Sequence, residues 1–310
     1  MTMFKSFKSF RNYAMSSAIA PYVHLARWHF PTGWHLVILP VLWSTALASY
    51  PLMRAGILSW KEIFWYLFIY IVGAIIFRGA ACTWNDLVDH DIDAHVARTR
   101  TRPLPSGQCS RFQAYVFGIL QLLISFLLLI QFNCFTIFMG CMILPISLLY
   151  PFSKRFIPCP QVVLGIGFAG GVLFGWGALH ASLSWPAFWL FIATIFWVVY
   201  FDTVYAHQDK KYDEKIGINS TARLFADQTK IWLFVLYGIF ILCFAVAFYL
   251  VQVNFVAWIG LFIALLLTIK RIITLDFSCP RQCDMFFKHA DYVGIFIFVC
   301  LMISLFLDQL

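Results

Sequence analysis

Two groups of carboxylates interrupt a chain in which 62% of the residues are hydrophobic. The first lies within residues 85–93, which read Asn-Asp-Leu-Val-Asp-His-Asp-Ile-Asp, and the second consists of Asp202, Asp209 and Asp213. A carboxylate beside hydrocarbon is costly, so an ionisable group in that position is a functional-site candidate by default. Two facing sets of carboxylates call for divalent cations, and Mg²⁺ held by a few carboxylates usually completes its coordination with substrate phosphates and water. This pattern indicates a membrane enzyme that acts on a diphosphate.

The spacing of the first cluster predicts that its ligands share one helical face. If the preceding apolar run continues as a helix, Asn85, Asp89 and Asp93 recur every four residues along one stripe. Arg78 lies two turns earlier on the same face, and Asp86 joins the cluster if it turns inward. Helix capping explains one such cluster about as well as metal binding does, but it leaves an arginine inside an apolar run unexplained.

The second cluster repeats this stripe, because Asp202, Asp209 and Asp213 follow a seven-then-four spacing. A bundle that brings the two stripes together forms a carboxylate cleft in which Mg²⁺ can bridge to diphosphate oxygens. Basic residues suited to a polyphosphate lie near the clusters in the sequence: Arg98, Arg102, Lys154, Arg155 and Lys215. Each of them is also a charge expected on the cytoplasmic face, so it carries little weight singly.

Membrane helices must position these groups. Only 12% of the residues are charged, 19% are aromatic and the mean hydropathy is +0.82, whereas a soluble domain has about 25% charged residues. We predict nine apolar spans, most of them near the roughly 20 residues that cross a bilayer: residues 33–50, 63–84, 112–131, 134–150, 161–181, 186–206, 231–251, 255–273 and 291–308. The expected fold is an all-α integral membrane bundle in one domain over residues 1–310, with a basic amphipathic segment at 1–30 and the transmembrane bundle at 31–310.

The basic residues predict the orientation. Most of the 22 Lys and Arg residues fall before the first span or in the even-numbered connections. By the positive-inside rule, the N-terminus and both acidic clusters face the cytoplasmic side. The net charge of +8 is therefore a topology signal rather than a sign of nucleic-acid binding. Phe4, Phe7 and Phe10, interleaved with basic residues, suit an interfacial helix, and the acid-free composition of residues 1–20 also suits a transit peptide.

Other chemistries lack a motif in this chain. The nine cysteines show no CxxC pair, so we predict neither a disulfide framework nor a thiolate metal site. No Walker-type glycine loop, dinucleotide fingerprint or nucleophile-with-base arrangement is found, so covalent catalysis is not indicated. A cation transporter is the alternative from another class, but it would place carboxylates at several depths, whereas both clusters are predicted at one face.

These clusters resemble the motifs of the UbiA family of intramembrane aromatic prenyltransferases. The family's NDxxDxxxD motif matches from Asn85, and its DxxxD motif matches from Asp209. Residues 78–83, 150–155 and 160–165 make the chain most similar to 4-hydroxybenzoate polyprenyltransferases. The resemblance runs from about residue 27 to residue 224, and the last three spans match only in hydropathy.

The resemblance implies nine helices around a central cavity and Mg²⁺-dependent transfer of a prenyl group to an aromatic ring. Its substrates would be a prenyl diphosphate donor and a phenolic acid acceptor such as 4-hydroxybenzoate, within a lipid bilayer and without nucleic acid. The metal ligands would be Asn85, Asp89, Asp93, Asp209 and Asp213, with the four carboxylates and Arg78 acting in catalysis. The diphosphate would contact Arg98, Arg102, Lys154, Arg155 and Lys215, and the acceptor would contact Arg27, His29, Asp202 and Tyr205.

The chain departs from the family pattern mainly outside the metal ligands. In the family's Arg-Leu-Asp-Lys-Pro-x-Gly motif, His29 and Phe30 replace the acidic and basic members. The middle of DxxxD, usually acidic, is Lys-Lys-Tyr, a usual Lys is Asn219, and Gly171 falls in a segment that usually contains Trp. These changes leave other acceptors open: a polyketide-derived phenolic acid of meroterpenoid metabolism, homogentisate, or a haem or chlorin.

Overall fold

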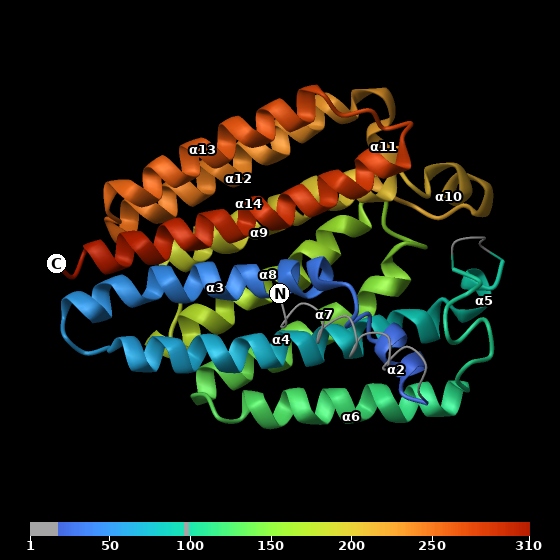
Figure 1. Cartoon of the computed structure of the whole chain (residues 1–310), viewed down its shortest axis with the longest axis horizontal. Coiled ribbons are helices and arrows are strands. Elements are labelled where there is room, and N and C mark those ends of the chain that lie inside the picture. The colour runs from blue at the N-terminus through green and yellow to red at the C-terminus, as the bar shows by residue number, and fades with distance from the viewer. Residues whose placement is uncertain (1–17, 96–98) are drawn as a thin grey trace, which may run out of the picture. The chain divides into compact units, whose positions relative to one another are not determined.

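The computed structural model describes residues 18–95 and 99–310, and every regular element in those ranges is a helix (Figure 1). Nine stretches of this described part are long and apolar enough to cross a membrane. They are α3 (Pro31–Arg54), α4 (Trp60–Val88), α6 (Arg111–Leu129), α7 (Cys134–Ser153), α8 (Pro160–His180), α9 (Trp185–Ala206), the stretch Thr221–Val251 that ends in α12 (Thr229–Val251), α13 (Phe255–Ile273) and α14 (Pro280–Leu307). The predicted all-α fold with nine spans is confirmed.

Shorter helices precede or connect the spans. They are α2 (Ala20–Leu25), α5 (His90–Asp93), α10 (Lys210–Ile216), α11 (Thr221–Phe225) and the 3₁₀ turn η1 (Ala226–Gln228). Phe4, Phe7 and Phe10, on which the predicted interfacial helix of the first 20 residues depends, lie outside the described residues. The cytoplasmic position of the N-terminus stays a prediction.

One predicted span boundary and one predicted continuous helix are wrong. The ninth span begins at Pro280 rather than near residue 291, because proline suits the first turn of a helix, and Asp291 therefore lies inside the span. The first acidic stripe is not one continuous helix, since α4 ends at Val88 and Asp89 precedes α5 with a ψ of 9°. Asp side chains compete with helical hydrogen bonds for nearby backbone groups, which favours a break at such a position.

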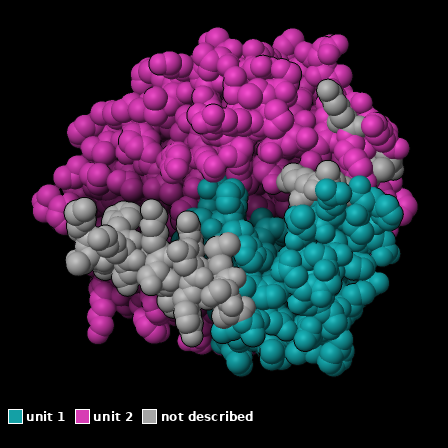
Figure 2. All heavy atoms as spheres, turned by 45° about the vertical axis from the view of Figure 1, so that its right-hand side comes forward, with its two compact units in different colours: residues 1–34, 73–127 teal, residues 35–72, 128–310 magenta. Residues whose placement is uncertain are grey.

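The chain divides into two compact units, shown separately coloured in Figure 2. Unit 1 comprises the described part of residues 1–34 with residues 73–127, and unit 2 comprises residues 35–72 with residues 128–310. Two compact units can share one domain, so a single domain over residues 1–310 stays a prediction.

Unit 1 has a small apolar core beneath the first acidic motif. Leu25, Leu87, Leu104, Cys109 and Ala114 are buried together. They come from α2, the end of α4, the loop after α5 and the start of α6. This core therefore fixes the segments that carry the first motif and the basic loop that follows it.

Large aromatic side chains pack against one another in the core of unit 2. The ring of Trp43 lies 4.8 Å from that of Trp197 and 5.2 Å from that of Phe244, and Phe240 lies 5.1 Å from Phe244. These four residues, which we call the aromatic layer, are all at most 1% exposed. Their edge-to-face contacts join α3, α9 and α12.

A polar seam runs along α3 and α14 within unit 2. From one end to the other it contains His35–Asp291, Trp43 with the Gly294 carbonyl, Tyr50–Ser304 and Arg54–Asp308. The residue numbers of these partners differ by 251 to 256, so the two helices run in the same direction in nearly constant register. The last helix is thereby tied to the first span along its length.

Gly175→Ala is expected to destabilise unit 2 by about 1–3 kcal/mol, because overpacking a close helix contact forces backbone shifts. An added Cβ would lie 2.6 Å from the Val41 carbonyl oxygen and 2.8 Å from Ser44 Cβ, both on α3. Gly238→Ala in α12 is the matched control, because nothing lies within 4 Å of its added Cβ. Helix propensity should make that control neutral or more stable by up to about 1 kcal/mol. Thermal unfolding in detergent measures both, and equal shifts would contradict this packing.

Candidate active site

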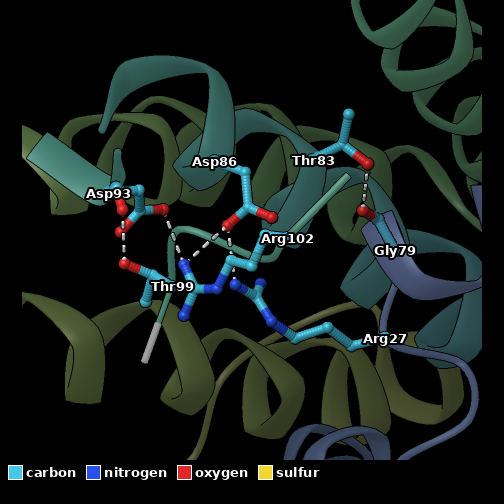
Figure 3. Close-up of polar contacts among 7 residues, drawn as sticks. All are labelled: Arg27, Gly79, Thr83, Asp86, Asp93, Thr99 and Arg102. Atoms are coloured by element: carbon cyan, nitrogen blue, oxygen red, sulfur yellow. Dashed lines mark hydrogen bonds and ion pairs between the residues drawn. The ribbon is translucent and has the colours of Figure 1, made fainter. Parts of the chain in front are cut away.

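Two arginines hold two carboxylates of the first motif together (Figure 3). Asp86 Oδ1 accepts hydrogen bonds from Arg27 Nη2 at 2.6 Å and from Arg102 Nη1 at 3.1 Å. The same Arg102 nitrogen donates to Asp93 Oδ2 at 2.7 Å. Because Asp86 is only 1% exposed, its charge requires such partners. We call these four residues the arginine–carboxylate cluster.

The backbone around the cluster directs both arginines toward it. After α2, Arg27 has a φ of 54°, a left-handed conformation that costs a residue with a side chain about 1–2 kcal/mol. Next to it, Trp28 Nε1 donates to the Ile75 carbonyl at 3.0 Å and ties this turn to α4. On the other side, Thr99 Oγ1 donates to the Asp93 carbonyl at 2.8 Å, and the Arg102 N–H donates to the Thr99 carbonyl at 2.9 Å.

The first motif has the donor chemistry of a magnesium site. Burial raises the pKa of Asp93, the charges of Asp86 and Asp89 raise it further, and Arg102 offsets only part of this effect. A further cation would stabilise the ionised carboxyl. Asn85 and Asp89, both half-buried, supply the oxygen donors that Mg²⁺ prefers. Within the ranges that the structure describes, no three His, Cys, Asp or Glu side chains form a metal site. Oxygen donors of this kind suit Mg²⁺, which usually keeps water and substrate phosphates among its ligands.

Arg78 of α4 has a hydrogen-bond donor that an anion would satisfy. Its Nε is buried and makes no hydrogen bond to any described residue. A buried donor without a partner costs about 1–3 kcal/mol, so an anionic ligand near the guanidinium would recover that loss. The predicted involvement of Arg78 in diphosphate chemistry is compatible with this environment.

The second acidic motif lies at the end of α9 in unit 2. Asp202 falls in the last turns of α9, Asp209 is the residue before α10, and Asp213 lies within α10. The predicted continuous stripe is wrong here as well, since the helix is interrupted between Ala206 and Lys210. Gly217, with a φ of 73°, ends α10 in a left-handed conformation that glycine adopts without steric cost.

A buried hydrogen-bond network holds the segment that follows this motif. The hydroxyls of Thr203 and Thr221 are 2.7 Å apart, and the Thr221 N–H donates to Gln161 Oε1 at 3.1 Å. The Asn219 N–H donates to the Lys154 carbonyl at 2.9 Å. The network ties α11 to α8 and α9 and brings the segment beside the end of α7. Sequence reasoning missed it, because hydroxyl and amide side chains in apolar runs carry no spacing signal.

The structure unites some predicted site residues and separates others. Arg27 and Arg102 join Asp86 and Asp93, so Arg27 contacts the first motif in addition to its predicted acceptor role. The other predicted binding residues range from half-buried to exposed: Lys154 and Tyr205 are half-buried, and His29, Arg155 and Lys215 are exposed. Arg98 lies outside the described residues. The first motif belongs to unit 1 and the second to unit 2, so their facing arrangement stays a prediction.

One ionisable pair was not predicted at all. His35 Nδ1 lies 3.0 Å from Asp291 Oδ2, between α3 and α14. An acid beside an apolar run was the available signal, but placing the start of the ninth span at residue 291 made Asp291 look like a boundary residue.

The sequence is similar to known prenyltransferases. The profile of the UbiA prenyltransferase family matches residues 37–302. The mitochondrial 4-hydroxybenzoate polyprenyltransferase of Drosophila melanogaster is 44% identical over 218 residues, which cover 70% of this chain and 54% of that protein. The 4-hydroxybenzoate geranyltransferase 2 of Lithospermum erythrorhizon is 37% identical over 295 residues, covering 92% of this chain and 91% of that protein. The matches span about half the length of the insect relatives.

The fold is similar to solved structures at low sequence identity. A UbiA homologue from Aeropyrum pernix K1 superposes with a TM-score of 0.72 at 22% identity, covering 87% of this chain and 97% of that one. A UbiA homologue from Archaeoglobus fulgidus bound to GPP and Mg²⁺ has a TM-score of 0.63 at 16% identity, covering 91% and 99%. With nine apolar spans in its described part and a family profile over most of its length, this chain belongs to the UbiA prenyltransferase family and is a multi-pass integral membrane protein.

Proposed function

We propose that this chain transfers a prenyl group from a prenyl diphosphate to a ring carbon of a phenolic acid such as 4-hydroxybenzoate, using Mg²⁺. The observation that carries the proposal is the arginine–carboxylate cluster in a chain whose relatives, at 34–44% identity, are named 4-hydroxybenzoate prenyltransferases. The relatives matched over more than nine-tenths of their length include a geranyltransferase and an octaprenyltransferase.

The oxygen donors of both motifs would hold the metal: Asn85, Asp89, Asp93, Asp209 and Asp213. When bound, Mg²⁺ neutralises charge on the diphosphate and stabilises the charge that develops on the leaving pyrophosphate. The cluster suits this role because Arg102 and Arg27 offset the charge of the buried Asp86, which lies between the predicted ligands Asn85 and Asp89 in the sequence.

Basic side chains would stabilise the pyrophosphate as the allylic C–O bond breaks. Arg78 contributes a guanidinium whose Nε has no hydrogen-bond partner among the described residues. The predicted phosphate contacts of Arg98, Arg102, Lys154, Arg155 and Lys215 would add to it. Donors positioned before the reaction lower its barrier because they need no reorganisation when charge develops.

The carbocation left by ionisation would be shielded by aromatic faces and kept from water by the surrounding bundle. The phenolic ring then attacks it at carbon, typically ortho to the hydroxyl, and a base removes the ring proton. Asp202 and Tyr205 at the end of α9, with Arg27 and His29, would orient the acceptor.

The test is turnover by the purified protein in liposomes with Mg²⁺ and geranyl, farnesyl or longer prenyl diphosphates. We would offer 4-hydroxybenzoate and an orsellinate-type acid side by side and identify prenylated products by mass. Product from 4-hydroxybenzoate is the expected result. Product from the second acid alone would make His29 and Phe30 specificity determinants and favour the meroterpenoid alternative. No prenylated product from either acid, in protein shown to be folded, would reject the proposal.

A further inference from the structure

The segment that follows the second acidic motif ties two predicted site residues of unit 2 together through its backbone. The Ile218 N–H donates to the carbonyl of Asp213, a predicted metal ligand, at 3.0 Å. The next N–H along the chain, that of Asn219, donates to the carbonyl of Lys154, a predicted phosphate contact, at 2.9 Å. Two adjacent residues therefore hold the backbones of Lys154 and Asp213 at a fixed separation. Because the contacts use backbone groups, they do not depend on the Asn219 side chain, which departs from the family pattern.

A buried side chain of α8 holds this segment in place. Thr221 is the first residue of α11, and the first N–H groups of a helix have no partner within it. Ser220 precedes α11 but forms no side-chain capping bond, and its buried Oγ makes no hydrogen bond to a described residue. The Thr221 N–H donates instead to Gln161 Oε1 at 3.1 Å, so the Gln161 amide caps α11 from another helix. Gln161 is only 4% exposed, and Thr221 is fully buried.

A pair of hydroxyls attaches the same segment to α9. Thr203 has one hydroxyl proton and donates it to the Val199 carbonyl at 2.5 Å. The Thr221 hydroxyl, 2.7 Å from Thr203 Oγ1, is therefore the donor between the two threonines. Thr203 follows Asp202 directly, so this bond fixes the segment against the helix that carries the second motif. Removing one acceptor from a buried network leaves a desolvated donor, which is why such a network holds one arrangement.

We propose that Gln161 and Thr221 are positioning residues for the diphosphate: they hold residues 218–219 so that Lys154 and Asp213 lie at the separation that a bound Mg²⁺–diphosphate requires. This inference rests on the proposed function and adds to it two residues that are not among the predicted site residues. Both act through the backbone of the segment rather than by contact with substrate. Such support matters because a group displaced by about 1 Å through a distant change can cost about 10²-fold in rate.

The test compares wild type with Gln161→Leu, which removes the acceptor and keeps a side chain of similar size. Calorimetry measures the binding of geranyl thiolodiphosphate, an analogue that resists ionisation, with Mg²⁺ and without acceptor, and steady-state rates use the acid that wild type prenylates. Gln161→Leu should weaken analogue binding, raise the KM for the prenyl diphosphate and lower its kcat/KM about 10- to 10²-fold. The KM for the acid should stay unchanged. A purely structural role would reduce the amount of folded protein and leave all of these constants as in wild type.

Thr221 offers a milder pair of variants. Thr221→Val removes the hydroxyl donor at similar shape and should shift the same constants in the same direction, but less. Thr221→Ser keeps the hydroxyl and should return them to the wild-type values. Thr194→Val is the matched control, because it removes a buried hydroxyl of α9 whose 2.9 Å bond to the Leu190 carbonyl stays within one helix. It should leave analogue binding and the KM for the prenyl diphosphate unchanged.

Wild-type analogue affinity and kcat/KM in folded Gln161→Leu would overturn the inference, while wild-type turnover still supported the proposed function. If Gln161→Leu does not fold, the same wild-type constants in Thr221→Val would overturn it. Equal shifts in Thr194→Val and Thr221→Val would also overturn it, because the effect would then not depend on the attachment of residues 218–219. Absence of prenylated product from wild type itself would instead reject the function on which the inference rests.

Discussion

Replacing Asp89 or Asp209 with alanine is expected to lower Mg²⁺-dependent prenyl transfer by about 10²- to 10³-fold or more, with insertion and folding retained. Removing one preorganised group that stabilises transition-state charge typically costs this much, and loss of a metal ligand adds to it. Both residues lie where a helix is interrupted, Asp89 before α5 and Asp209 before α10. Neither is fully buried, so the change should act on catalysis rather than on packing. The measurement is the initial rate of prenylated product in liposomes over a range of Mg²⁺ concentrations.

Asp91→Ala is the matched control within the first motif. Its side chain is 89% exposed, and it is not among the predicted ligands. It should keep the wild-type rate and Mg²⁺ dependence. Wild-type activity in either Asp89→Ala or Asp209→Ala would contradict a mechanism that needs both acidic clusters, and a loss confined to Asp89→Ala would restrict the metal site to unit 1.

Arg102→Ala is expected to destabilise unit 1 by about 3 kcal/mol, because removing one partner of a buried ion pair leaves an uncompensated charge. Arg102 bridges Asp86 at 3.1 Å and Asp93 at 2.7 Å through one nitrogen. The guanidinium is 24% exposed, so we place the effect at the lower end of the roughly 3–5 kcal/mol expected for a buried pair. Arg27 remains at Asp86, whereas Asp93 loses its ion pair with Arg102. Thermal unfolding in detergent, followed by near-ultraviolet circular dichroism, measures the loss.

Arg100→Ala provides the comparison, since it removes the same charge from an exposed position in the same loop. Its effect should stay within about 0.5 kcal/mol, as is usual for exposed substitutions. Adding Asp93→Asn to Arg102→Ala should recover part of the stability, because the buried charge that lost its partner is then absent. Equal unfolding temperatures for the Arg100 and Arg102 variants would show that the cluster does not stabilise unit 1.

Helical periodicity predicted that the acidic motifs lie at helix ends, but it did not predict the backbone conformation within them. The four-residue spacing of Asn85, Asp89 and Asp93 suits an unbroken helix, yet the helix ends at Val88. Periodicity reports which residues share a face if a helix exists, and it cannot register the local competition of an Asp side chain with the helical backbone. The same limit applies between Ala206 and Lys210, where the second predicted stripe is interrupted.

Two polar features depended on contacts that no local pattern encodes. Arg27 and Asp86 are separated by 59 residues, and His35 and Asp291 by 256. Each side chain alone reads as a topology charge or a helix-end residue. Only the packing of α14 along α3 makes Asp291 a buried group with a histidine partner.

The sequence by itself determined that this is an all-α membrane protein with nine spans, and which residue types supply its oxygen donors and cations. Those properties follow from hydropathy, length and short-range spacing, because hydrocarbon leaves a spanning helix few alternatives. The tertiary structure alone decided which arginine neutralises which carboxylate, where the helices carrying the motifs are interrupted, and that His35 meets Asp291. These outcomes rest on the desolvation of charges brought together from distant parts of the chain, an energy that exists only once the helices have packed.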